Sequence, residues 1–583
     1  MRQDVGFAIV WAGIVGIELI ISPEGNAAAL SQLRSETAPC LSFALAQQPD
    51  LTPNPLPPSH ENPFLQPTPL PAPLPPEPNP IAPSPPPAPA AAPSNSDIQI
   101  PVEQIQVVGS TVFSDQDLAP LIQPFEGRSL TLEELRAIAD SITQLYLDGG
   151  YLTSRAVLVD QQIVQKTVQI RVIEGSLERI EIEGAHRVNS NYIRDRIALG
   201  GKAPLNQGHL EDQLRLLRLD PLFDNVEASL RPGNSLGQSI LVVRVTEANP
   251  FSATVGVDNY SPPSVGSERT GVAIGYLNPT GLGDALQGSY FRSTTGGSNV
   301  FNFSYQVPLN AMNGGLQLQV APSSYKITDP KFAPLNIQGN SNQYALSYRQ
   351  PLLRSPREEF ALSLGLTYET GETLVSSFLA DTSTTSVISF GQDYVRRDPA
   401  GAWAARSQFN LGTRLFEATH GSTPDGQFFS WLGQFQRVQI LNPDHLLITQ
   451  LDVQLTPNPL LPSQQFVIGG GQSIRGYQQN IRLGDNGFRF SIEDRITVQR
   501  DPNGNPLLQL APFTDLGAVW NTSTNPNPLP DQNFLAGLGF GVLWQPWPHL
   551  NVRADFAVPL VNLSDRGNNL QDSGVYFSVN WQY

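Results

Sequence analysis

The chain has 583 residues, more than one ordinary domain holds, so its length predicts several domains. Only 15% of the residues are charged and the net charge is -17, which argues against a nucleic-acid partner, because phosphates require clustered lysine and arginine. With one cysteine, Cys40, and six scattered histidines, the sequence predicts no disulfide, no metal site and no cofactor.

The N-terminal segment predicts an exported protein. The apolar stretch 7–21 suits the core of a signal peptide, and Ala44-Leu45-Ala46 offers a small-residue cleavage site, so residues 1–46 are expected to be the signal peptide. A short membrane anchor is the alternative for this stretch. No later segment has the roughly 18 consecutive apolar residues of a transmembrane helix, so any membrane crossing must use strands.

A proline-rich linker is expected over residues 47–97. The stretch 49–93 alone holds 20 of the 53 prolines. Proline fixes φ and removes a backbone donor, which predicts an extended polyproline-type spacer. We favour a plain tether over a docking motif for this segment.

An internal repeat follows the linker. The segment Ile105-Gln106-Val107-Val108-Gly109 recurs 75 positions later as Ile180-Glu181-Ile182-Glu183-Gly184, and Arg171-Val172-Ile173-Glu174 recurs 73 positions later as Arg244-Val245-Thr246-Glu247. Two similar modules are therefore expected, over residues 98–175 and 176–249.

Each module predicts the order β-α-α-β-β. In the first, Thr131 and Glu134 form a capping box ahead of an apolar helical pattern. In the second, Asn206 is the expected N-cap of a helix that Asp220-Pro221 ends. Alternating apolar residues, such as those at 168, 170 and 172, predict the closing strands.

After Pro250 the pattern changes to alternating runs of about ten residues separated by Gly, Pro, Asn and Asp turns, which is typical of an outer-membrane barrel. Residues 250–583 are expected to form an antiparallel transmembrane β-barrel of about sixteen strands, so the fold class is α/β followed by all-β. The expected strands are 251–259, 268–277, 283–293, 298–307, 314–322, 341–351, 358–370, 384–396, 401–414, 427–440, 444–455, 488–499, 507–520, 534–544, 548–557 and 575–582.

The last run has one continuous apolar face. Val575, Phe577, Val579, Trp581 and Tyr583 alternate with polar or amphipathic residues, and the chain ends on an aromatic side chain. Alternation of this kind predicts a strand with one side toward lipid.

A glycine-rich loop, residues 456–487, is the main candidate for a functional site. It follows the eleventh run, so it is an external loop if the two modules are periplasmic. It contains a set of glycines around one arginine and one tyrosine: Gly469, Gly470, Gly471, Arg475, Gly476 and Tyr477. The glycines allow the loop to turn back on itself.

Two carboxylates on neighbouring strands are expected to meet this arginine. Alternation turns Phe513, Asp515 and Gly517 of the thirteenth run inward, and it turns Glu493 of the twelfth inward as well. Arg475 presents paired donors that match carboxylates, so a lumen ion pair with Asp515 and Glu493 is predicted. Asp494 departs from the pattern, because alternation places it toward lipid.

These motifs resemble the outer-membrane two-partner-secretion transporters of the haemolysin and filamentous-haemagglutinin secretion-activation family, whose barrels carry POTRA (polypeptide-transport-associated) domains. The turn Asn278 to Asp284 is also similar to a turn near the start of those barrels. The resemblance implies a periplasmic POTRA pair and an inward-folding loop whose Arg475 meets Asp515, as a gate or as a structural brace. It also implies that Phe577, Trp581 and Tyr583 form an insertion signal for the barrel-assembly machinery.

The resemblance implies a pore in the outer-membrane lipid that exports an unfolded, β-rich exoprotein. Strand addition to the POTRA modules, near 131–148 and 206–219, would capture it. The alternatives are a barrel-assembly insertase and, less favoured, a passive porin. An enzyme is not expected, because neither a Gly-x-Ser-x-Gly elbow nor a Gly-x-x-x-x-Gly-Lys phosphate loop occurs. Family members often have an N-terminal plug helix; cleavage after Ala46 would leave none here.

Overall fold

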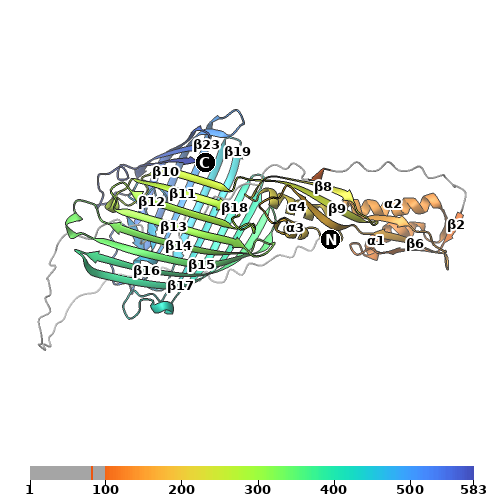
Figure 1. Cartoon of the computed structure of the whole chain (residues 1–583), viewed down its shortest axis with the longest axis horizontal. Coiled ribbons are helices and arrows are strands. Elements are labelled where there is room, and N and C mark those ends of the chain that lie inside the picture. Colours follow the sequence, from red (N-terminus) through yellow and green to blue (C-terminus); the bar gives the residue numbers. More distant parts are fainter. Residues whose placement is uncertain (1–80, 83–98) are drawn as a thin grey trace, which may run out of the picture. The chain divides into compact units, whose positions relative to one another are not determined.

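The computed structural model describes residues 81–82 and 99–583 (Figure 1). The expectations for the signal peptide 1–46, for Cys40 and for all but two residues of the linker 47–97 lie outside the described residues. Within the described part of the chain, no helix is both long enough and apolar enough to span a bilayer.

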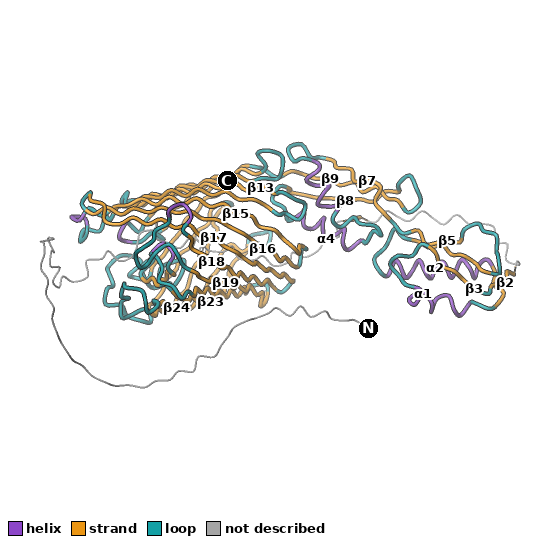
Figure 2. The backbone as a smooth tube through the Cα atoms, turned by 90° about the horizontal axis from the view of Figure 1, so that it is seen from below, coloured by secondary structure: helices purple, strands orange, loops and turns teal. Residues whose placement is uncertain are grey.

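The first module is a small α/β unit. Its elements are β2 (Gln99–Val102), β3 (Gln104–Val108), α1 (Asp115–Ile122), the 3-10 helix η3 (Gln123–Phe125), β4 (Arg128–Thr131), α2 (Leu132–Asp148), β5 (Arg155–Leu158) and β6 (Thr167–Ile173). The main sheet has the order β3-β6-β5, and β2 pairs separately with β4. Helix α2 lies beside β5 (Figure 2).

Helix α2 starts where the capping box predicts. The Thr131 hydroxyl accepts from the Glu134 backbone nitrogen at 3.1 Å, and the Glu134 carboxylate accepts from the Thr131 nitrogen at 2.7 Å. One face of the helix is buried in the core of the module through Leu135, Ile138, Ala139, Ile142 and Tyr146. Burial of this stripe stabilises a helix whose isolated form would be marginal in water.

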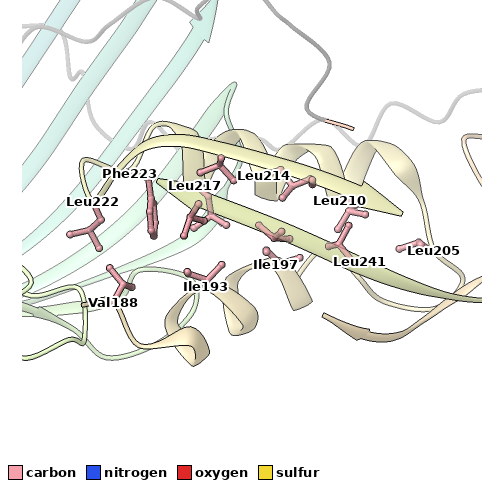
Figure 3. Close-up of a cluster of buried hydrophobic side chains, with 14 residues drawn as sticks. Val188, Ile193, Ile197, Leu205, Leu210, Leu214, Leu217, Leu222, Phe223 and Leu241 are labelled. Carbon is pink, nitrogen blue, oxygen red and sulfur yellow. The ribbon is translucent and has the colours of Figure 1, made fainter. Parts of the chain in front are cut away.

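The second module has the expected order β-α-α-β-β and repeats the core of the first, which departs from that order by the additional pair β2 and β4. Its elements are β7 (Ser176–Glu183), α3 (Ser190–Ala198), α4 (Gln207–Arg218), β8 (Phe223–Pro232) and β9 (Gln238–Glu247). Asn206 caps α4 by accepting from the nitrogens of Gly208 and His209. The two helices pack Ile193, Ile197, Leu210 and Leu214 onto apolar side chains of the sheet such as Leu241 of β9 (Figure 3). The sheet order is β8-β9-β7, and β1 (Ile81–Ala82) adds in parallel to β8.

The repeated glutamates, Glu174 and Glu247, accept equivalent backbone hydrogen bonds in the two modules. Glu174 accepts hydrogen bonds from the nitrogens of Thr111 and Val112, and Glu247 accepts from the nitrogens of residues 186, 187 and 188. Each carboxylate therefore fixes the loop that leaves the first strand of its module. Partial burial raises the pKa of Glu174, but the hydrogen bonds from Thr111, Tyr146 and Val112 outweigh it, so the net pKa is lowered.

The remaining chain forms the predicted closed antiparallel barrel, sixteen strands among the described residues (Figure 1). The strands are β10 (Phe251–Asp258), β11 (Arg269–Leu277), β12 (Ala285–Ser293), β13 (Ser298–Pro308), β14 (Gly315–Lys326), β15 (Gln338–Arg354), β16 (Glu358–Val375), β17 (Phe378–Asp398), β18 (Gly401–Thr413), β19 (Phe429–Asn442), β20 (His445–Leu455), β23 (Asn486–Arg500), β24 (Pro506–Trp520), β25 (Phe534–Trp547), β26 (Leu550–Pro559) and β27 (Val575–Gln582). Pairing of β10 with β27 closes it. Short 3-10 turns lie at Pro263–Val265, Ala333–Leu335, Leu415–Glu417 and Pro462–Gln464.

The predicted inside and outside faces are observed. On β24, Phe513, Asp515 and Gly517 are buried inward, whereas Leu510 and Trp520 are exposed outward. The turn between β11 and β12 is held by Asp284, which is fully buried and accepts from the nitrogen of Thr280 and the hydroxyl of Tyr305.

The predicted ends of four strands were wrong. Strand β14 continues to residue 326 where 322 was expected, and β15 begins at 338 where 341 was expected. Strand β16 continues to 375 where 370 was expected, and β17 begins at 378 where 384 was expected. The added residues mix polar side chains with glycine and with an apolar group at 374, 375 and 378–380, and they show no regular apolar alternation, so hydrophobic alternation does not reveal them. These strands therefore extend as a paired sheet beyond the ends that the alternation predicts.

Asp494 lies on the outer face as alternation predicts, and it has a partner there. Its carboxylate is 2.8 Å from Nδ1 of His445 on the neighbouring strand β20. His445 is the first residue of β20 and β23 ends at Arg500, so the pair lies toward the end of the barrel where short turns join the strands. A charge costs less at such an interface than at mid-membrane depth.

Candidate functional site

The glycine-rich loop between β20 and β23 carries a small hairpin and a buried tip. The hairpin pairs β21 (Phe466–Ile468) with β22 (Arg482–Gly484). The tip turns at Gly470 and Gly476, whose φ angles are 102° and 104°, values that side chains with a Cβ rarely adopt. Gly469 has a similar φ of 107°, but Gly471 has another role: a Cβ there would lie 2.5 Å from the ring of Tyr260.

Arg475 lies at the end of this tip and is only 5% exposed. Its guanidinium donates to both carboxylate oxygens of Asp515, at 2.7 Å from Nε and 2.8 Å from Nη2. Nη1 donates to Glu493 at 2.7 Å, and the backbone nitrogen of Arg475 also donates to Asp515 at 3.1 Å. The structure thus brings together the three residues that the sequence singles out, in a bidentate geometry that a lysine could not supply.

Three more charged residues complete what we call the lumen cluster: Arg475, Glu493, Arg495, Asp515, Arg553 and Asp555. Arg553 on β26 donates to Glu493 at 2.8 Å and to Asp555 at 2.8 Å, and Arg495 donates to Glu493 at 2.8 Å. Asp555 is fully buried and lies 3.6 Å from Nη1 of Arg475. The cluster contains three cations and three carboxylates, so its charges balance only when Arg475 of the docked loop is present, because the wall alone supplies two arginines and three carboxylates.

Partners of the cluster differ in how much they depend on the loop. Glu493 and Asp555 are held by arginines of the barrel wall. Asp515 is held chiefly by Arg475; beyond the loop it accepts from the hydroxyl of Ser491 at 2.6 Å. Asp515 is therefore the carboxylate that would lose most if the loop left.

Phe513, the first residue of the predicted Phe-x-Asp-x-Gly strand motif, supports the arginine from below. The guanidinium carbon of Arg475 lies 3.2 Å from the centre of its ring. Arginine stacked on an aromatic face gains a cation–π attraction that strengthens when water is excluded. Gly517 leaves space for the tip, because a Cβ there would lie 2.7 Å from Ile474.

Several residues of the site were missed at the level of sequence. Gly537 on β25 lies so close to the loop that a Cβ would be 2.0 Å from the Arg475 carbonyl oxygen. The Tyr576 hydroxyl accepts from the Gly476 nitrogen at 2.8 Å and donates to the carbonyl of Tyr477. For Arg553 and Asp555 a signal existed: two opposite charges two residues apart share one face of a strand. For the glycine and the tyrosine no sequence signal existed.

A second set of contacts holds the outer part of the loop. The Tyr477 hydroxyl donates to the carbonyl of Ala536 at 2.7 Å. Arg482, almost fully buried, donates to both carboxylate oxygens of Asp565 at 2.9 Å. Because Asp565 belongs to the connection between β26 and β27, the loop is fastened both to the barrel wall and to a neighbouring external connection.

An apolar core accompanies these polar contacts. Phe466, Ile468, Ile474 and Ile481 of the loop pack with inward-facing residues of the wall, including Leu432 and Val519. Burial of such side chains contributes about 1.5–3 kcal/mol each relative to exposure, so the loop is docked by hydrophobic contact as well as by charge.

Comparison with known proteins decides the family. Residues 237–543 match the family described as haemolysin secretion/activation protein ShlB/FhaC/HecB, and residues 100–175 match a ShlB-type POTRA domain. The chain belongs to this family. It is therefore an outer-membrane two-partner-secretion transporter, and its POTRA region is periplasmic.

Individual relatives agree with this assignment. The chain is 26% identical over 411 residues to the outer membrane transporter CdiB of Escherichia coli, covering 66% of this chain and 67% of that protein. It is 24% identical over 403 residues to the hemolysin transporter protein ShlB of Serratia marcescens, covering 67% and 71%. The fold is similar to that of CdiB from Escherichia coli, with a TM-score of 0.67 and 22% identity over 85% of this chain and 93% of that one.

The fold also resembles BamA from Haemophilus ducreyi, with a TM-score of 0.50 and 18% identity over 83% of this chain and 100% of that one. At this identity the likeness shows a shared fold only.

Proposed function

We propose that loop 456–487 of this transporter is a movable plug, and that Arg475 within the lumen cluster is the contact that keeps it docked. The observation that carries the proposal is the asymmetry of the cluster. Glu493 and Asp555 have arginine partners on the wall, whereas Asp515 depends on the arginine of the loop. Withdrawal of the loop would therefore uncover one carboxylate in a lumen that water could then fill.

The same asymmetry separates a gate from a brace. A brace would link two wall strands, as Arg489 of β23 does with Asp452 of β20 at 2.6 Å. Arg475 instead links the wall to a segment with three glycines of positive φ and a hairpin of its own. Forming a buried ion pair costs desolvation energy, and separating it leaves a buried charge without its partner. Such a contact favours two discrete states of the loop, docked and withdrawn.

We further propose that the second module, residues 176–249, is a second POTRA domain and that the edge of the first module captures an unfolded exoprotein. Strand β5 is an edge of its sheet and lies against α2, so an added strand would lie beside that helix. Backbone pairing at an edge tolerates many sequences, as a carrier of unfolded chains requires. The edge of β8 is already paired, in part, with β1.

At the last strand we propose the insertion signal. Trp581 and Tyr583 are exposed on the outer face, and the Tyr583 backbone pairs with Ala253 of β10. An exposed aromatic end is what assembly machinery and outer-membrane lipid would meet first. Under this proposal the chain transports its substrate without a catalytic step.

The test is secretion by variants that still fold. Arg475→Ala should insert normally but change the amount of co-expressed exoprotein that is exported, because the plug is no longer held at the lumen cluster, while Arg489→Ala serves as the matched loss of a wall arginine. Deletion of 102–175 should abolish binding of the unfolded exoprotein yet keep ion conductance in planar bilayers. Unchanged secretion by Arg475→Ala would exclude the plug role, and secretion by the deletion variant would exclude capture by the first module. Preferential binding of unfolded barrel proteins would favour the insertase alternative.

A further inference from the structure

The outer face of strands β13 to β17 continues beyond the membrane as a polar surface. These strands lie side by side in Figure 1, and their registers align residues into rows that run across the sheet. One row joins Phe303, Val320, Tyr344 and Tyr368, with the two tyrosine rings stacked at 6.4 Å between centroids. The neighbouring row, one step closer to the centre of the bilayer, contains Leu318, Leu346 and Leu366.

The aromatic row marks the external boundary of the apolar band. Aromatic girdles flank the lipid-facing band of such barrels at both interfaces. With about 3.4 Å per residue along a strand that is tilted by about 40° from the membrane normal, the two rows that follow lie roughly 5 and 10 Å above the girdle. That is the depth of lipid head groups and the sugars attached to them, and not of open solvent.

Apart from Pro322, the residues of both rows are polar. The first aligns Pro322, Asn342, Thr370 and Thr384. The second aligns Asn299, Ser324, Asn340, Glu372 and Thr382 across five strands. Asn340 donates to the Glu372 carboxylate at 2.9 Å, which fixes the orientation of its amide. The rows line a concavity of about 630 Å³, with Phe301 and Pro322 on its membrane side.

Polarity is not a general property of the external strand ends. On the other side of the barrel the outer face stays apolar to the last residues of the strands, at Leu411, Phe429, Leu455, Trp520, Phe534 and Val558, each at least 39% exposed. The concavity is therefore a local feature of the sector formed by β13 to β17.

We propose that this concavity binds the neutral sugar units of a glycolipid in the surrounding outer leaflet. Amide, hydroxyl and carboxylate groups offer the mixed donors and acceptors that sugar hydroxyls require. The apolar faces of Phe301 and Pro322 suit the C–H face of a sugar ring. Its lining residues include one carboxylate and neither lysine nor arginine, so phosphate groups are not the recognised part. The position just above the girdle selects a sugar anchored in the membrane over a free one.

The test uses the full chain in phosphatidylcholine nanodiscs, titrated with the oligosaccharide released from bacterial lipopolysaccharide by mild acid. Saturable binding is expected, and the double variant Asn340→Ala with Glu372→Ala should weaken it by at least about tenfold. The matched control removes one amide and one carboxylate from the exposed connection 521–533, as Asn527→Ala with Asp531→Ala, and should bind as the wild type does. Heat-modifiable migration on gels verifies that each barrel is folded.

Intact lipopolysaccharide added to the same nanodiscs should bind more tightly than the released sugar. Equal binding by wild type and the Asn340/Glu372 variant would overturn the site. So would absence of oligosaccharide binding to the wild type, or equal retention of lipid A that lacks the sugars. Tighter binding of the free sugar than of the membrane-anchored form would overturn the glycolipid as its source.

Discussion

Removal of the Arg475 side chain is the sharpest perturbation of the plug. In Arg475→Ala, Asp515 loses two guanidinium hydrogen bonds while it remains fully buried, and the backbone nitrogen of residue 475 and the Ser491 hydroxyl remain as donors. Removing one partner of a buried ion pair costs about 3–5 kcal/mol. Glu493 keeps Arg495 and Arg553, so the cost falls mainly on Asp515.

This cost acts on the docked state of the loop, because withdrawal lets water reach Asp515. Since about 1.4 kcal/mol is a factor of ten, the population of withdrawn loops should rise roughly 100- to 4,000-fold. The assay is the labelling rate of a reporter cysteine at Ile474, which is fully buried in the docked loop, in a background with Cys40→Ser. Arg475→Ala is compared with the same reporter carrying the native arginine.

Two further variants test whether the ion pair holds the loop. Asp515→Asn should also raise the labelling rate, and the double variant should raise it by less than the product of the single effects, because the two side chains interact directly. Arg489→Ala should leave the rate unchanged. A labelling rate that Arg475→Ala does not alter, or effects that simply multiply in the double variant, would show that the ion pair does not hold the loop.

Three smaller predictions test other parts of the structure. Arg482→Ala removes the bidentate contact with Asp565. Because Asp565 is partly exposed, the labelling rate at position 474 should rise only about tenfold. Arg500→Ala, which removes a more exposed arginine, is the control. Gly537→Ala places a Cβ 2.0 Å from the Arg475 carbonyl oxygen, so it should release the loop without any change of charge. In the control Gly288→Ala the nearest contact of the Cβ would be 3.8 Å, and the loop should stay docked. Equal labelling rates at position 474 in the two variants would refute the close approach. Glu174→Gln should destabilise the first module by about 1–2 kcal/mol, seen as faster hydrogen exchange at residues 111–112. The folded pKa of Glu174 lies below its ordinary value of 4.5. Its contribution to stability is therefore complete above pH 4.5 and is lost as the pH falls through the folded pKa. Exchange rates of the wild type and the variant should thus converge in acid, and divergence in acid would contradict the assignment.

Periodicity in the sequence was enough to predict the architecture. Alternation has a period of two residues in strands, and the inward or outward direction of a side chain follows from its parity, so Asp515 and Glu493 could be placed in the lumen before any coordinates were known. The internal repeat predicted two modules of one design, and Thr131 and Asn206 predicted where their long helices begin. All of these signals are local, because each depends on residues a few positions apart.

The same reliance on hydrophobic alternation explains what failed. Strands β14 to β17 extend beyond the predicted runs through residues in which apolar side chains do not alternate, so no apolar period marks their ends. Backbone pairing with neighbouring strands holds them in register there, and pairing partners are not visible in the sequence of one strand.

Sequence alone thus determined the modules, the barrel, the glycine-rich loop and the three charged residues that meet. Tertiary structure decided that Asp555 and Arg553 join them, that Gly537 and Tyr576 receive the loop, and that Asp515 alone among the carboxylates depends chiefly on Arg475. Those facts follow from the closure of the barrel, which brings β23, β24, β25, β26 and β27 around one segment of loop, and contacts of that kind join residues up to 100 positions apart.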